Sequence, residues 1–255
     1  MGLNKMCHPA DLASLIDTAN KALPRMAGRV GDAHDEQLVY GCASNPSRIA
    51  ELHAHWVSAH PEAGPHYWSI RSWSLLIWQP IYLSFLAVHL ARQAPCLAGM
   101  GQSVCDGLVG GFCLPQHCPR RGHQADLISF AAEQLHQFVD RQLGDFNSVC
   151  QIYPKLARLL AADCARAALL WVDRCQPLGN TRLRDLEGQW MEALALSPGS
   201  SLIEVHTDDG RQCMALGRKV CCQHFRRADG EFCNTCPKLK QEERLQRLRE
   251  EFAQA

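Results

Sequence analysis

The chain has 255 residues, of which 47% are hydrophobic and 20% are charged. This balance is typical of a globular protein with a sizeable core, built as one large domain or as a body with a small appendage. The 26 basic and 26 acidic residues cancel to a formal net charge of zero. Because nucleic-acid binding depends mainly on an excess of Lys and Arg, the composition gives no reason to expect a nucleic-acid partner.

The first 15 residues include Lys5 and Asp11 and lack an apolar run of signal-peptide length, so we expect a cytoplasmic protein. The most apolar stretch, residues 75–90, is shorter than the ~20 residues of a membrane span, and Gln79 and Pro80 interrupt it. It predicts a pair of buried helices, broken or kinked at Pro80. A peripheral contact with the inner membrane is a second interpretation.

Apolar residues recur with helical periodicity in several other segments. These segments are residues 9–23, 45–58, 123–143, 154–171 and 181–196. Pro46 and Pro154 each stand where a helix accepts proline, at its first turn. The sequence therefore predicts a predominantly helical body.

Glycines are frequent between residues 97 and 114, which predicts short strands or turns. The pair Gly99 and Gly101 does not complete a dinucleotide-binding fingerprint, because Val104 occupies the position of the third glycine. A glycine-rich turn is the better interpretation. The sequence therefore gives no reason to expect a bound dinucleotide.

After a predicted break at residues 197–200, residues 202–206 and 211–216 alternate in polarity around an Asp-Gly turn, which predicts a β-hairpin. The tail from Pro237 onward predicts a short charged helix. We therefore expect a mainly α (α+β) fold. Residues 1–200 would form a predominantly helical body, and residues 201–255 would form a hairpin followed by a cysteine-rich segment.

Four of the 14 cysteines gather near the C-terminus, within 16 residues. Cys221 and Cys222 are adjacent, and ten residues later Cys233 and Cys236 form a C-x-x-C pair. Closing so short a loop around a common centre costs little entropy. We expect the other cysteines to be thiols or small buried residues, because a reducing cytosol disfavours disulfides.

Three kinds of site fit these four cysteines. Soft thiolates select both zinc and iron–sulfur clusters. Zinc sites usually space their paired cysteines by two to four residues, and side chains of adjacent residues on an extended chain point to opposite faces, so adjacent cysteines suit a single ion poorly. A two-iron cluster is larger and accepts ligands from a wider arc, whereas two disulfides would need an oxidising compartment.

Basic side chains flank the four cysteines and could offset an anionic cluster or attract an anionic partner. They are Arg218, Lys219, Arg226, Arg227, Lys238 and Lys240. Cys236 followed by Pro237 also predicts a helix start, whose free N–H groups would point at the ligand sulfur.

The pattern C-C-x10-C-x2-C followed by Pro-Lys resembles the C-terminal signature of the FhuF-type ferric-siderophore reductases. Weaker resemblance lies upstream, in Tyr67-Trp68, in the run from Trp78 to Tyr82, in Gly101-Gln102 and in the run from Val109 to Phe112. In that family the four cysteines hold a two-iron, two-sulfur cluster. Gln223 departs from the apolar residue expected after the cysteine pair, so packing around the cluster is expected to differ.

The resemblance implies that Cys221, Cys222, Cys233 and Cys236 bind a [2Fe-2S] cluster in an oxidoreductase of iron acquisition. It would reduce iron(III)-siderophores by one electron, with a reduced flavoprotein or a ferredoxin as donor. The clustering of charge, independently of the resemblance, predicts substrate binding near Arg218, Arg226 and Arg227. Two alternatives stay open: an iron–sulfur electron carrier or sensor without siderophore activity, and a zinc-stabilised binding module.

Overall fold

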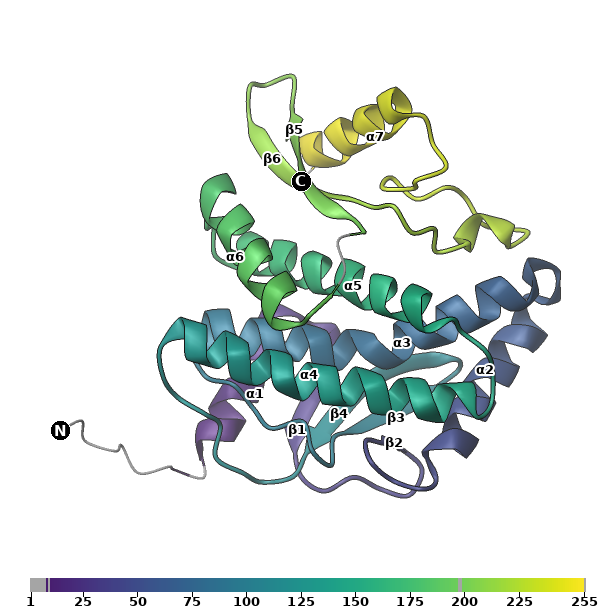
Figure 1. The fold of residues 1–255 in the computed structure, drawn as a ribbon, viewed down its shortest axis with the longest axis vertical. Coiled ribbons are helices and arrows are strands. Elements are labelled where there is room, and N and C mark those ends of the chain that lie inside the picture. Colours follow the sequence, from purple (N-terminus) through teal and green to yellow (C-terminus); the bar gives the residue numbers. More distant parts are fainter. Residues whose placement is uncertain (1–7, 9, 197–198, 255) are drawn as a thin grey trace.

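The structure, a computed structural model, describes residue 8, residues 10–196 and residues 199–254. Within these residues the chain forms helices α1 to α7 and strands β1 to β6, with the strands in two small sheets (Figure 1). The fold is therefore mainly α with some β, as the sequence predicts. Part of the predicted break at residues 197–200 lies outside the described residues.

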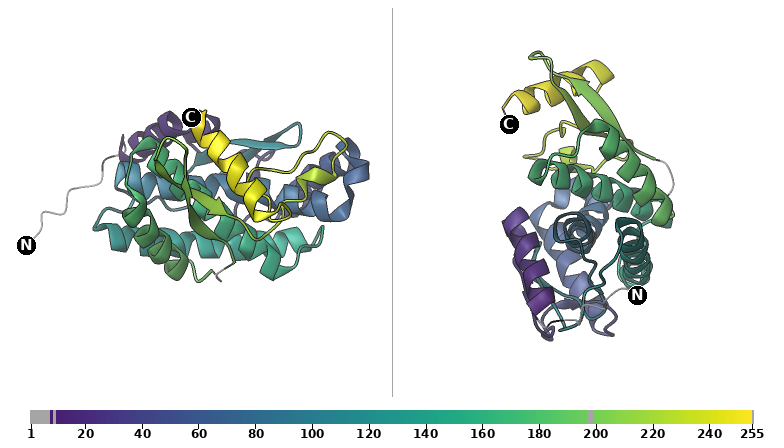
Figure 2. Two further views of the ribbon diagram at one scale, coloured as in Figure 1. Left: turned by 90° about the horizontal axis from the view of Figure 1, so that it is seen from above. Right: turned by 90° about the vertical axis from the view of Figure 1, so that its left-hand side faces the viewer.

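The helical body follows the predicted segments closely. Long helices α3, α4 and α5 run across the molecule, with α1 and α2 at their sides and α6 beside α5 (Figures 1 and 2). Their bounds are α1 Ala10–Ala22, α2 Asn45–Ala59, α3 Gly64–Leu86, α4 Gln124–Asn147, α5 Pro154–Cys175 and α6 Asn180–Ala193. Pro154 stands in the first turn of α5, because its missing N–H would have no partner there in any case.

Helix α3 corrects one prediction. The apolar stretch is not a pair of helices: α3 runs through Pro80 without ending and continues into a π-helical turn, Ala87–Ala91. Proline removes one backbone hydrogen bond, but burial of most side chains from Tyr67 to Leu86 outweighs that loss. Tertiary packing, which the sequence pattern does not display, therefore keeps the helix continuous.

A four-stranded sheet lies beneath these helices. Its order is β1-β4-β3-β2, with β1 parallel to β4 and the other pairs antiparallel. The bounds are β1 Gly28–Val30, β2 Leu38–Val39, β3 Gly101–Cys105 and β4 Leu108–Leu114. The glycine-rich region thus forms the predicted strands, whereas β1 and β2 are too short to give a sequence signal.

The tryptophans tie the layers of the body together, because each of the six donates its indole N–H to an acceptor. Trp73 is fully buried and joins α3 to α5 by a 3.0 Å hydrogen bond to the carbonyl of Ala157. Trp78 joins α3 to β4 through the carbonyl of Val109, 2.9 Å away. These bonds satisfy the polar edge of each ring, so its apolar remainder can pack.

The C-terminal residues lie on one side of this body, over α5 and α6 (Figure 1). Strands β5 (Ser201–His206) and β6 (Gln212–Gly217) form the predicted hairpin, closed by a bond from the Gly210 N–H to the Thr207 carbonyl. Helix α7 (Gln241–Ala253) packs Leu248 against the hairpin. The division into residues 1–200 and 201–255 stays a prediction.

Buried charges join the hairpin to α5. Arg166, with a side chain only 4% exposed, places its Nε 2.5 Å from Oε1 of Glu187 on α6. Glu187 also accepts a hydrogen bond from the backbone N–H of Leu202 on β5, at 3.1 Å. One carboxylate therefore links two helices and the hairpin.

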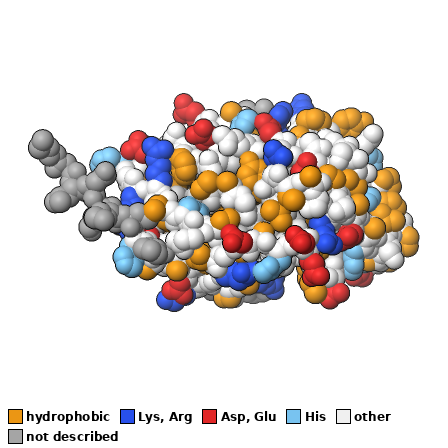
Figure 3. Space-filling view, turned by 90° about the horizontal axis from the view of Figure 1, so that it is seen from below, with side chains coloured by type: hydrophobic (Ala, Val, Ile, Leu, Met, Phe, Trp, Pro, Cys, Tyr) orange, Lys and Arg blue, Asp and Glu red, His pale blue; other side chains and the backbone are white. Residues whose placement is uncertain are grey.

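The face opposite the C-terminal residues mixes basic, acidic and apolar side chains, with no single sign of charge dominating (Figure 3). The stretch Pro61–Ala91 has the length of a membrane span, and its most apolar 18 residues have a mean hydropathy of 1.5. However, 67% of these 18 residues are buried inside the molecule, as in the core helix of a globular protein. A contact with the membrane stays a prediction.

We predict that Glu187→Gln lowers the free energy of unfolding by about 3 kcal/mol, because Arg166 loses its carboxylate while it stays buried. The matched control is Asp140→Asn, in the exposed pair that Asp140 forms with Arg158 at 3.2 Å. It should cost less than ~1 kcal/mol. Urea denaturation of both variants measures the difference, and equal losses would contradict the buried link.

Candidate metal centre

The cysteine segment, residues 218–240, leaves β6 and crosses the body before α7 begins (Figure 1). Its one regular element is the 3-10 turn η4 (His224–Arg226), which contacts α3 and the short helix η2 (Pro61–Ala63). The Cys236 side chain is buried, and the other three cysteines are half-buried. The four thiols therefore lie at the junction of the body with the C-terminal residues.

Two of these thiols are in direct contact. The Cys222 thiol donates a hydrogen bond to the Cys233 sulfur, which lowers the pKa of Cys233 to about 7 and, together with burial, raises the pKa of Cys222. Cys236 lies close enough to Cys233 for its charge to affect that pKa. The Cys221 sulfur instead accepts a hydrogen bond from the backbone N–H of Gln223, at 3.4 Å.

The residue after the cysteine pair turns the chain. Gln223 has a left-handed backbone conformation, with φ of 59°. This turn brings the N–H of Gln223 to Cys221 and the backbone of His224 to Cys222, so each sulfur of the pair receives a backbone hydrogen bond. The Gln223 side chain accepts a 2.8 Å bond from Arg226 Nε, a role that the expected apolar residue could not fill.

The predicted helix start at Pro237 is wrong. Helix α7 begins at Gln241, and the chain after Cys236 first makes a tight turn with the Leu239 N–H bonded to the Cys236 carbonyl at 3.2 Å. Glu242 and Glu243 place their negative charge in the first turn of α7, where the helix dipole favours it. The backbone donors to sulfur therefore come from the turn after Cys222.

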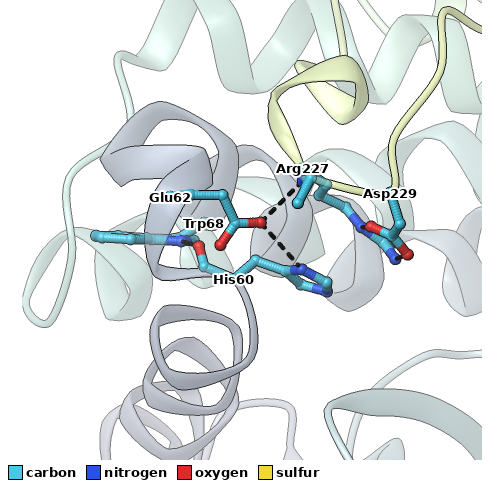
Figure 4. A network of polar contacts seen from close by, with 6 residues as sticks. His60, Glu62, Trp68, Arg227 and Asp229 are labelled. Atoms are coloured by element: carbon cyan, nitrogen blue, oxygen red, sulfur yellow. Dashed lines mark hydrogen bonds and ion pairs between the residues drawn. The ribbon is translucent and has the colours of Figure 1, made fainter.

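The loop between the two cysteine pairs is held against η2, as Figure 4 shows. Glu62 accepts a 3.0 Å hydrogen bond from the Ala228 N–H, and its Oε1 lies 3.5 Å from His60 Nδ1. On the loop itself, Arg227 and Asp229 form an ion pair. Residues far apart in sequence thus fix the loop that separates the cysteine pairs.

A cavity beside the cysteines has a volume of about 810 Å³, and Cys222 forms part of its wall. A cavity of this size suits an organic ligand or chelate. Helices α3 and α5, strand β4 and the cysteine segment all contribute to its wall. The lining residues are Leu23, Arg25, Arg71, Ser74, Leu75, Ile77, Trp78, Tyr82, Leu108, Val109, Gly110, Leu160, Asp163, Cys164, Ala167, Trp171, Arg218 and Cys222.

Of the three arginines that the sequence nominates for substrate binding, Arg218 lines this cavity. Its Nε lies 3.2 Å from Oδ2 of the buried Asp163, an ion pair without hydrogen-bond geometry. Arg226 and Arg227 lie outside the cavity lining, on the loop, bonded to Gln223 and Asp229. Their part in substrate binding stays a prediction.

Sequence reasoning missed the cavity residues of α3. Arg71, Ser74, Trp78 and Tyr82 follow at intervals of three and four, so they share one face of the helix. Trp78 lies in the stretch that the sequence predicts to be buried, but its ring is half-buried and lines the cavity. The intervals between these residues are visible in the sequence, but nothing in the sequence shows which face of α3 meets the cysteines.

The chemistry of the four thiols fits a cluster with two irons. All four are free thiols. Elsewhere, Cys118 is in a disulfide, which differs from the expectation that the other cysteines are thiols or small buried residues. Thiolates are soft donors, and the sulfurs of Cys221 and Cys222 already receive backbone hydrogen bonds. A two-iron cluster needs four thiolates over a larger span, with hydrogen bonds to their sulfurs.

Residues 218–238 match the family model of the FhuF 2Fe-2S C-terminal domain. The match covers all four cysteines and confirms the resemblance of this segment to FhuF-type proteins. It indicates a [2Fe-2S] cluster, so this chain is an iron–sulfur protein in its C-terminal part. The matched segment begins at Arg218, directly after β6 ends.

We predict that Glu62→Ala loosens the loop between the cysteine pairs, because Ala228 loses its acceptor. The visible absorption of the cluster should then decay severalfold faster in air than in the unchanged protein. Glu51→Ala is the control, since Glu51 is exposed and pairs with Arg48 on α2. Equal decay in both variants would show that this contact does not protect the cluster.

Proposed function

We propose that this protein is a one-electron reductase of iron(III)-siderophores. In this proposal Cys221, Cys222, Cys233 and Cys236 hold the [2Fe-2S] cluster. Residues 1–200 supply most of the substrate cavity, and residues 201–255 supply the cluster segment. The observation that carries the proposal is the position of Cys222, which forms part of the wall of the 810 Å³ cavity.

The chemistry requires a single electron. Siderophores hold iron(III) through hard oxygen donors, and iron(II) binds such donors far less tightly. One electron from an external donor converts iron(III) to iron(II), so the metal can leave and the siderophore remains otherwise unchanged. A [2Fe-2S] cluster, when bound, supplies one electron at a time. A chelate in this cavity would lie against the side chain of a cluster ligand, which keeps the transfer distance short.

The protein would also hold the chelate and exclude water from it. The apolar walls of the cavity, such as Leu75 and Leu160, suit the organic part of a siderophore. Arg218 offers a cation beside Cys222. We propose Arg226 and Arg227, on the loop between the cysteine pairs, as a second contact for substrate or partner.

The electron donor would be a reduced flavoprotein or a ferredoxin in the cytoplasm. Two features of the loop support this. Phe225 and Phe232 stack at a centroid distance of 5.0 Å, and Phe232 is 38% exposed. Exposed Arg226 follows Phe225 in the chain, and the ammonium of exposed Lys238 stands over the Phe225 ring. An acidic redox partner would complement this surface.

We predict that each of Cys221→Ser, Cys222→Ser, Cys233→Ser and Cys236→Ser removes most of the bound iron and acid-labile sulfide, because hydroxyl is a poor substitute for a soft thiolate. Cys175→Ser is the control, since Cys175 is exposed at the end of α5. Anaerobic metal and sulfide analysis measures the effect. Stoichiometric zinc without sulfide in the unchanged protein would favour the zinc-stabilised module and overturn the proposal.

We predict that the chemically reduced protein, freed of excess reductant, releases about one iron(II) per cluster from a ferric siderophore. An iron(II)-specific chromogenic chelator detects the product, and re-oxidation of the cluster is followed by its absorption. The Cys222→Ser variant should release none. A cluster that reduces readily but releases no iron(II) from any ferric siderophore would identify an electron carrier or sensor instead.

A further inference from the structure

The cavity beside Cys222 carries more positive charge than its wall neutralises. Three arginines line it, Arg25, Arg71 and Arg218, against one carboxylate, Asp163. Asp163 pairs with Arg218. In the part of the chain that the structure describes, no ion pair involves Arg71 or the exposed Arg25, so two of the three arginines in the wall have no carboxylate partner.

Arg71 is the more informative of the two. It is half-buried on α3, and its buried Nε has no hydrogen-bond partner among the described residues. Its guanidinium carbon lies 4.7 Å from the centroid of the Trp56 ring, which supports the cation from one side. Burial without a counter-ion is unfavourable for a cation, so this group suits a site that receives an anion.

Aromatic rings form another part of the same wall. Trp78, Tyr82 and Trp171 line the cavity. The indole N–H groups of Trp78 and Trp171 already donate to backbone carbonyls at 2.9 and 3.0 Å, so these rings are fixed in orientation. Burial raises the pKa of Tyr82, so its ring stays neutral. Flat, neutral surfaces beside free guanidinium groups suit an anion whose charged oxygens lie on aromatic rings.

We propose that the cavity prefers an anionic iron(III) chelate with aryl oxygen donors, such as a tris-catecholate, over a neutral chelate such as a tris-hydroxamate. This specificity rests on the proposed reductase function. Arg71 and Arg25 contact the anionic oxygens, and the aromatic rings pack against the aryl groups.

The arginines have a competing role, because the cluster with its four thiolates is itself an anion. Arg71 and Arg218 both act electrostatically on Cys222. Arg25 lies in the turn before β1, whereas the arginine that acts electrostatically on both Cys222 and Cys233 is Arg218. A comparison of two chelates on the same cluster-loaded protein separates damage to the cluster, which affects both chelates alike, from a change of charge at the cavity, which affects the trianion.

The test uses gallium(III), which has the charge of iron(III) and is not reduced. Isothermal titration calorimetry of the cluster-loaded protein compares gallium(III) tris-catecholate, a trianion, with neutral gallium(III) tris-hydroxamate. The unchanged protein should bind the trianion at least about tenfold more tightly. Arg71→Met and Arg25→Gln should each weaken binding of the trianion by about tenfold and leave binding of the neutral complex within about twofold.

Arg141→Gln is the control, because exposed Arg141 on α4 lies outside the cavity lining. It should change neither affinity. Retained absorption of the cluster shows that a variant is folded. If Arg71→Met loses its cluster, Arg25→Gln still tests the proposal. Equal or tighter binding of the neutral complex, or equal weakening of both complexes, would overturn the proposal.

The gallium(III) and iron(III) chelates together distinguish failure of this specificity from failure of the proposed reductase activity. Release of iron(II) from neutral and anionic ferric chelates with no difference in affinity would overturn the specificity and keep the reductase. Tight, arginine-dependent binding of the gallium trianion without iron(II) release from any ferric chelate would overturn the reductase and keep the anion site.

Discussion

Two buried charges on one face of α5 determine how the C-terminal residues sit on the body. Asp163 and Arg166 are three residues apart and both are almost fully buried. Arg166 pairs with Glu187, which holds the start of the hairpin at Leu202. Asp163 faces Arg218, directly after the hairpin. Because a buried charge needs its partner, both ends of the hairpin are tied to one helix, and the cysteine segment starts from a fixed point.

From that point the cysteine segment runs to η2, which its turn η4 contacts. The left-handed turn at Gln223 and the bond from Ala228 to Glu62 place Cys222 at the cavity and Phe232 at the surface. The cysteine segment therefore contributes Cys222 to a cavity of ligand size and also carries exposed aromatic and basic residues. This arrangement suits a centre that receives an electron from outside and passes it inward.

The cavity itself depends on the continuity of α3. A break at Pro80 would separate Arg71 from Tyr82, which lie on one face only because the helix runs on between them. The apolar character that resembles a membrane span follows from the same requirement. A central helix packed by α1, α2, α4 and α5 must be apolar on most of its surface.

The sequence by itself determined the mainly helical body, the hairpin and the clustering of four cysteines, because periodicity, turn residues and ligand spacing are local patterns. The spacing left zinc and iron–sulfur open, and the resemblance of the cysteine motif to FhuF-type proteins implied the [2Fe-2S] cofactor. The sequence did not determine which face of α3 meets Cys222, nor that Arg71 and Arg25 share a cavity with Arg218. Those relations join residues more than a hundred positions apart, and they arise only when α3, α5 and the cysteine segment pack together. Helix α7 starts at Gln241 and not at Pro237, because the chain from Cys233 to Leu239 forms turns in which Cys236 is buried in the folded protein.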